Sequence, residues 1–274
     1  LDDMGFTQKC PYKLHLMVLD TVLDGLESPK KSEVLYATDK DIYMFLLIFR
    51  QSFLLPPTHY DSLAKMLKTY RSWICKDYFL YNWPEIMEKS RNTYYRVFID
   101  NLAQTFFMKG EDSYMDLHLN MCYEAFDIFQ FFTSIAEKVE FETWNDLLAT
   151  HIQIYEHLIE KVNSSDPYES QIGKMLERTC VRNLFVLWIK AHPDDNFVEL
   201  WNSFYELLAK HIGLENLFHM WKITVINLTR VIVNRIFDLP LDLVDSDFTE
   251  YTTELYELEK KNRKWKTTQK PHTL

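Results

Sequence analysis

Two groups of side chains in this sequence could take part in chemistry: a cluster of ligand-type residues and a lone arginine. His192-Pro193-Asp194-Asp195 brings together imidazole and carboxylate groups, which bind metal ions. The same residues suit a polar loop that caps the following helix, and we expect that role. Arg50 lies within the apolar run from Ile48 to Pro56. An arginine finger that assists phosphoryl transfer needs a mobile, exposed position, so we expect Arg50 to pair with a carboxylate or to extend to the surface.

The common sequence marks of catalysis and of cofactor binding are missing from this chain. No GxGxxG, GxxxxGKS/T, HExxH or GxSxG motif occurs. The chain has only 5 glycines and they are scattered, so no loop is suited to approach a phosphate group closely with its backbone. His151 and His157 are six positions apart and do not share a helical face as an i, i+4 pair would. The sequence therefore predicts no catalytic residue, no cofactor and no metal ion, and so a protein that is not an enzyme.

A short Trp-Asn motif occurs twice, 57 positions apart, as Glu142-Thr143-Trp144-Asn145 and Glu199-Leu200-Trp201-Asn202. Each copy begins a helical stretch that follows another helical stretch after a polar break, a pattern typical of stacked helical pairs. We expect both tryptophans to fill the core between paired helices; exposed ligand-stacking residues are the alternative. The structural or interface candidates are Trp144, Trp201, Trp188, Arg50 and Phe53.

Apolar residues recur at helical spacing along most of the chain, and no strand pattern interrupts them. Thr38 with Asp41 and Asp166 with Pro167 are typical helix starts. We expect nine or ten helices, over about 11–27, 39–55, 58–73, 83–108, 112–137, 140–162, 166–191, from 196, and 214–237. The predicted fold is all-α, an α-solenoid of stacked antiparallel helical pairs of the HEAT type over residues 1–245. Residues 246–274 are polar and rich in basic residues, which predicts the end of a helix or a linker.

Charge and composition exclude several classes of protein. The formal net charge of −10 disfavours binding to nucleic acid or to an anionic membrane, because both attract positive surfaces. The longest apolar run, Ile42 to Phe49, is far shorter than the roughly 20 residues that span a bilayer. The cysteines are far apart and form no CxxC pair, which indicates reduced thiols in the cytosol. Because Leu1 stands where a Met would be expected, we interpret the chain as a segment of a longer protein.

An ordered series of short blocks resembles a known family. The run from Ile48 to Pro56, followed by Tyr70-Arg71-Ser72-Trp73-Ile74, resembles the helical N-terminal region of the catalytic alpha subunits of Ral GTPase-activating protein complexes, which are relatives of tuberin. Further blocks resemble that region in the same order: Phe141 to Leu148, Leu187 to Ala191, Glu199 to Trp201, and Phe237 to Asp242. The resemblance covers roughly residues 34 to 245, but no block matches between residues 76 and 112.

The resemblance implies a scaffold rather than a catalyst. In that family a separate C-terminal domain promotes GTP hydrolysis by inserting an asparagine into the GTPase, and nothing in this sequence resembles that domain. The implied partners are a beta subunit and a regulatory or substrate Ras-family GTPase. As an alternative, Phe45 to Phe53 resembles the start of the helical accessory module of Ras-type guanine nucleotide exchange factors. The two Trp-Asn motifs do not belong to that second pattern.

The aromatic content also favours an interaction protein. The chain has 19 Phe, 16 Tyr and 7 Trp, more than a single array of helical pairs can bury within itself. Aromatic residues are enriched in the cores of protein interfaces. We therefore expect an exposed apolar patch of several hundred Å² that docks another subunit or a small GTPase.

Overall fold

The computed structural model describes residues 11–74, 85–191, 197–211 and 213–237, and it confirms the prediction of an all-α fold. These residues form eleven α-helices and three 3-10 helices, and they contain no strand. The α-helices are α1 (Tyr12–Glu27), α2 (Pro29–Leu35), α3 (Asp39–Ser52), α4 (Tyr60–Ile74), α5 (Glu85–Lys89), α6 (Arg91–Phe107), α7 (Met115–Phe131), α8 (Phe141–Val162), α9 (Pro167–Ala191), α10 (Val198–His211) and α11 (Glu215–Phe237). The 3-10 helices are η1 (Pro57–His59), η2 (Asp112–Tyr114) and η3 (Phe132–Lys138).

Both predicted helix starts have the expected capping geometry. The backbone N–H of Asp41 donates to Oγ1 of Thr38 at 3.2 Å, and that hydroxyl donates to the Asp41 carboxylate at 2.6 Å. At α9 the backbone N–H of Tyr168 donates to Oδ1 of Asp166 at 2.9 Å. These bonds satisfy backbone donors that the first turn of a helix leaves without a partner.

The helices differ from the predicted ranges in three places. A short helix, α2, follows α1 directly at Pro29, whereas the sequence suggested only a polar stretch there. The single helix expected over 83–108 is interrupted at Ser90, which separates α5 from α6. The helix expected over 112–137 changes to 3-10 geometry after Phe131, and Ile135 departs from helical backbone angles (φ −116°, ψ 20°). Propensity patterns do not register such local changes of hydrogen bonding.

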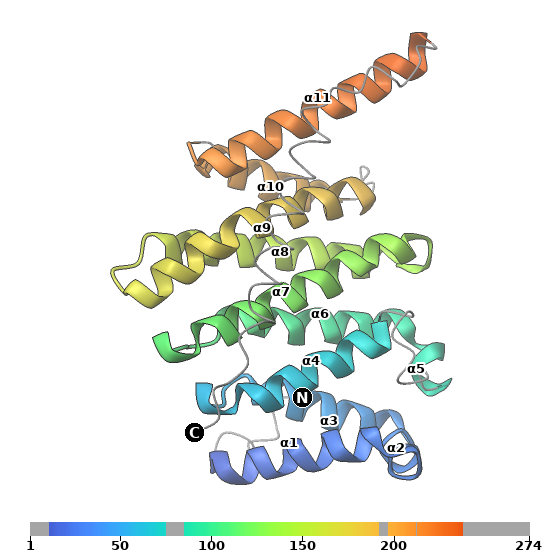
Figure 1. Ribbon diagram of the computed structural model, residues 1–274. Coiled ribbons are helices and arrows are strands. Elements are labelled where there is room, and N and C mark those ends of the chain that lie inside the picture. The colour runs from blue at the N-terminus through green and yellow to red at the C-terminus, as the bar shows by residue number, and fades with distance from the viewer. Residues whose placement is uncertain (1–10, 75–84, 192–196, 212, 238–274) are drawn as a thin grey trace, which may run out of the picture. The chain divides into compact units, whose positions relative to one another are not determined.

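Residues 1–217 form one compact unit, in which the helices lie in two layers (Figure 1). In one layer α1 contacts α4, α4 contacts α7, and α7 contacts α9. In the other layer α3 contacts α6, α6 contacts α8, and α8 contacts α10. Contacts between α8 and α9, α6 and α7, and α1 and α3 join the two layers. Successive helices of a layer are therefore neighbours, as they are in stacked helical pairs, while the finer HEAT-type assignment stays a prediction.

The two longest helices of this unit, α8 and α9, pack especially closely. Gly173 of α9 lies against the backbone of α8, and a Cβ atom there would come within 2.6 Å of the Val162 nitrogen and 2.9 Å of the Leu158 oxygen. Only a glycine permits this approach, because every other residue carries a Cβ. The α8–α9 pair is therefore fixed by backbone proximity as well as by side chains.

Residues 218–274 form the second unit, of which the structure describes residues 218–237. The described part is the continuation of α11, and its exposed residues include Phe218, Ile232 and Ile236. No helix among the described residues combines the length and apolar character needed to span a bilayer. The cluster 192–195 and the boundary predicted at residue 245 both lie outside the described residues, as does the basic stretch beyond it.

Candidate protein-interaction surfaces

Arg50 and Phe53 both belong to the end of α3 but have different surroundings. The Arg50 guanidinium pairs with the Asp100 carboxylate of α6, with 2.5 Å between Nη1 and Oδ2. Both side chains are about half exposed, so this ion pair joins two helices of one layer at the surface. Phe53 is buried at the C-terminal end of α3. Arg50 therefore pairs with a carboxylate at the surface, as expected from the sequence, and Phe53 contributes to the core.

Trp144 and Trp188 lie in the core. Each is only 5% exposed, Trp144 on α8 and Trp188 on α9. The Trp188 ring stacks on Phe204 of α10, with a centroid distance of 4.1 Å and an interplanar angle of 21°. A stacked aromatic pair of this kind adds to the free energy gained by burying the two rings. Trp188 therefore joins α9 to α10.

Trp201 does not have the buried position that we expected from its match with Trp144. It is 39% exposed, although its ring meets Trp188 edge-on at a centroid distance of 4.8 Å. The row of buried residues is wider on α8 than on α10. On α8 this row includes Trp144 and Leu148. On α10 the matching positions are Trp201 and Tyr205, and both are exposed. The motif repeats in sequence but not in burial.

The exposed side of α10 carries an apolar face, which we call the α10 face and define as Val198, Trp201 and Tyr205. These residues follow each other at i, i+3 and i+7, so they lie on one side of the helix. Their exposed fractions are 56%, 39% and 72%. Large exposed apolar and aromatic side chains that share one helix face are typical of protein docking surfaces.

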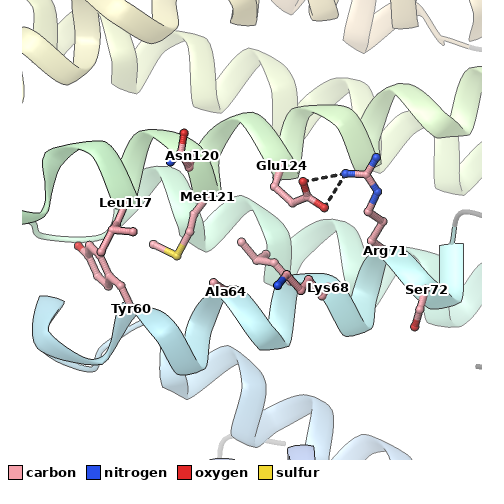
Figure 2. Close-up of a pocket in the computed structure, with 10 residues that line it drawn as sticks. Tyr60, Ala64, Lys68, Arg71, Ser72, Leu117, Asn120, Met121 and Glu124 are labelled. Carbon is pink, nitrogen blue, oxygen red and sulfur yellow. Dashed lines mark hydrogen bonds and ion pairs between the residues drawn. The ribbon is translucent and has the colours of Figure 1, made fainter. Parts of the chain in front are cut away.

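A groove lies between α4 and α7, in one layer of the first unit, and encloses about 420 Å³. Figure 2 shows Tyr60 and Leu117 at one end of this α4–α7 groove, and Arg71 facing Glu124 at the other. Nη1 of Arg71 donates to both carboxylate oxygens of Glu124 at 2.7 Å. The full lining is Tyr60, Ala64, Leu67, Lys68, Arg71, Ser72, Leu117, Asn120, Met121 and Glu124.

A second groove, of about 390 Å³, lies between α8 and α10 in the other layer. Its lining is mainly polar and includes Glu156, Glu206 and Lys210. Lys210 and Glu156 form an ion pair across it, with 3.6 Å between nitrogen and oxygen. The polar groups of this groove are thus partly satisfied by the chain itself.

The structure also contains a buried polar cluster that the sequence did not indicate. Nε2 of His118 lies 2.8 Å from the Thr105 carbonyl, which accepts only, so Nε2 carries the proton and Nδ1 accepts from the Tyr168 hydroxyl at 2.6 Å. Burial lowers the pKa of His118 to about 4, which keeps the ring neutral near pH 7. The Lys161 ammonium donates to the Phe106 carbonyl at 3.1 Å, in the last turn of α6.

The Cys122 thiol belongs to the same cluster, since its Sγ lies 3.7 Å from the Thr105 carbonyl oxygen. Burial lowers the pKa of Lys161 and raises that of the Cys122 thiol, which lies in the same cluster. A thiol with a raised pKa is a poor nucleophile. Cys122 and Cys180 are both buried free thiols, while Cys10 and Cys75 lie outside the described residues. Among the described residues no His, Cys, Asp and Glu side chains are grouped in a way that could hold a metal ion.

Comparison with known proteins relates this chain to one family. The family model described as the RALGAPB N-terminal domain matches residues 114–239, which include α7 to α11. Ral GTPase-activating protein subunit alpha-1 of Rattus norvegicus is 25% identical over 163 residues, and the Mus musculus protein gives the same values. The Homo sapiens protein is 23% identical over 161 residues.

The similarity covers part of each protein. It spans 54% of this chain but only 8% of the length of these alpha-1 relatives. No solved structure matches the chain significantly. The family model begins next to α7, so α1 to α6 lie before its matched range. The chain thus contains a helical region that is similar to the RALGAPB N-terminal domain and to part of Ral GTPase-activating protein subunit alpha-1.

Proposed function

We propose that this chain is a non-catalytic helical scaffold within a Ral GTPase-activating protein subunit, and that its α10 face docks another protein in the cytosol. The observation that carries the proposal is the position of the α10 face. Val198, Trp201 and Tyr205 are exposed together within residues 114–239, the range that matches the RALGAPB N-terminal domain. A scaffold needs a surface of this kind, since aromatic residues dominate the binding energy of many interfaces.

The beta subunit of the complex is the partner that we favour. The chain is similar both to proteins named as alpha-1 subunits and to a domain named after the RALGAPB protein. We propose that this helical region, which resembles parts of both kinds of subunit, mediates their assembly. A regulatory or substrate Ras-family GTPase is the second partner class. The alpha-1 relatives also favour this family over the exchange-factor module that Phe45 to Phe53 resembles.

Single-turnover GTP hydrolysis tests the claim that the chain is non-catalytic. The isolated chain should leave the hydrolysis rate of Ral and of other Ras-family GTPases unchanged. A complete Ral GTPase-activating complex serves as the positive control. Acceleration of hydrolysis by the chain alone would overturn the scaffold assignment.

Substitutions on the α10 face test the claim that this face docks the partner protein. Trp201→Ser and Tyr205→Ser remove exposed aromatic area and should weaken binding to the beta subunit while the fold is kept. Leu54→Ser is the matched control, because Leu54 is a large apolar residue that is 81% exposed elsewhere in the same unit. Equal binding by all three variants would show that the α10 face is not the interface.

A further inference from the structure

The α4–α7 groove has the shape and lining of a site for an apolar helix face. Its α4 side includes Tyr60, Ala64, Leu67 and Arg71, which follow one another at i, i+4, i+7 and i+11 and so lie along one face. This stretch is about 17 Å long at 1.5 Å per residue, enough to accommodate two to three turns of another helix. The described residues contain no strand, so an edge for strand addition is not available within them.

The floor of the groove is apolar and buried, while its walls are partly open. Leu67 and Met121 are almost fully buried beneath it, and Leu117 on the α7 side is 42% exposed. A cavity of about 420 Å³ falls within the usual range of roughly 300–1,000 Å³ for binding pockets. Apolar side chains that enter this groove would therefore exchange water for apolar contacts.

The charged residues that line the groove indicate which charge a bound partner should carry. Arg71 and Glu124 are bound to each other, so together they add little net charge to the groove. Lys68 borders the groove, is exposed, and forms no ion pair with any residue that the structure describes. Among the charged residues that line this groove, Lys68 is thus the one whose charge is not balanced by an ion pair, and an ammonium group complements a carboxylate.

We propose that the α4–α7 groove docks an acidic amphipathic helix of a partner protein. Apolar side chains of that helix, spaced at i and i+3 or i+4, enter between α4 and α7 over Leu67 and Met121. A carboxylate on the same helix pairs with Lys68. The site is separate from the α10 face, and it does not require the chain to act in a Ral GTPase-activating complex.

A selection from a displayed library of random 15-residue peptides tests this proposal on the whole chain. The wild-type chain serves as bait, and the Ala64→Trp variant, in which an indole fills the groove, serves for counter-selection. Enriched peptides should carry net negative charge and apolar residues at i and i+3 or i+4. Enrichment of basic or patternless peptides, or no enrichment at all, would overturn the proposal.

Titration of the most enriched peptide, with a fluorescent label, then locates the site. Lys68→Glu should weaken binding by about tenfold or more, since it replaces an attraction by a repulsion. Lys65→Glu is the matched control, because Lys65 is an exposed lysine of the same helix that does not line the groove. Equal loss in the two variants would indicate a general charge effect, and no loss in Lys68→Glu would exclude the groove. Circular dichroism and thermal unfolding establish that each variant is folded.

Discussion

Trp144 and Trp201 occupy equivalent positions in a repeated motif, yet only the first is enclosed. Trp144 is 5% exposed, and Trp201 is 39% exposed while its ring leans on Trp188. The sequence identified the right helices but could not distinguish these environments. The burial of each tryptophan depends on which other helices pack against its side of the helix. Those helices are distant along the chain, so a local motif does not reveal them.

The two tryptophans should respond differently to truncation. Trp144→Ala should lower the free energy of unfolding by about 3–5 kcal/mol, the usual cost of deleting a large buried aromatic side chain. Trp201→Ala should cost much less, because part of the ring is already in water, and should instead reduce binding to the partner. Urea unfolding of both variants measures the first effect. Equal destabilisation would mean that Trp201 is part of the core in solution.

Two buried histidines make the stability of the fold depend on pH. Burial lowers the pKa of His118 and of His151 to about 4, from the ordinary value of 6.5. Between about pH 6.5 and pH 4 the unfolded chain therefore binds more protons than the folded chain, and stability falls as the pH falls. The melting temperature should decline through this window. The decline should be shallower in His151→Met, and an unchanged slope would contradict burial of a neutral ring.

At the scale of helices, the sequence predicted the long elements well. The caps at Thr38 and Asp166 have the expected hydrogen bonds, and the long helices α8 and α9 lie close to their predicted ranges. The break at Ser90 and the 3-10 turn after Phe131 were missed, since no proline or glycine marks either place. The α4–α7 groove was missed as well, because its two walls are about 50 residues apart and only packing brings them together.

The close contact between α8 and α9 reverses the expected effect of a glycine-to-alanine substitution on stability. Gly→Ala within a helix ordinarily stabilises by up to about 1 kcal/mol. At Gly173 the added Cβ would meet the backbone of α8 at 2.6 Å, so Gly173→Ala should destabilise by about 1–3 kcal/mol. Gly25→Ala is the control, because the nearest atom there belongs to the Leu35 side chain, which is able to move. The denaturant midpoint should fall in Gly173→Ala but not in Gly25→Ala. An equal fall in both variants would contradict the close backbone contact at Gly173.

At the scale of the molecule, ion pairs and hydrogen bonds join successive helices of each layer. Arg50–Asp100 joins α3 to α6, Arg96–Asp146 joins α6 to α8, and Arg71–Glu124 joins α4 to α7. The first two pairs are exposed and contribute little to stability individually, whereas Arg71 and Glu124 are each only about a quarter exposed. The two proposed docking surfaces, the α10 face and the α4–α7 groove, both lie on helices that pack against their neighbours in the first unit.

Sedimentation velocity of the chain mixed with a beta subunit of the Ral GTPase-activating complex tests the central claim most directly. The account predicts a complex that sediments faster than either protein alone. This complex should be lost in the Trp201→Ser, Tyr205→Ser double variant and kept in Leu54→Ser. Two unchanged boundaries with the wild-type chain, or an equally stable complex with the double variant, would contradict a scaffold that docks its partner through the α10 face.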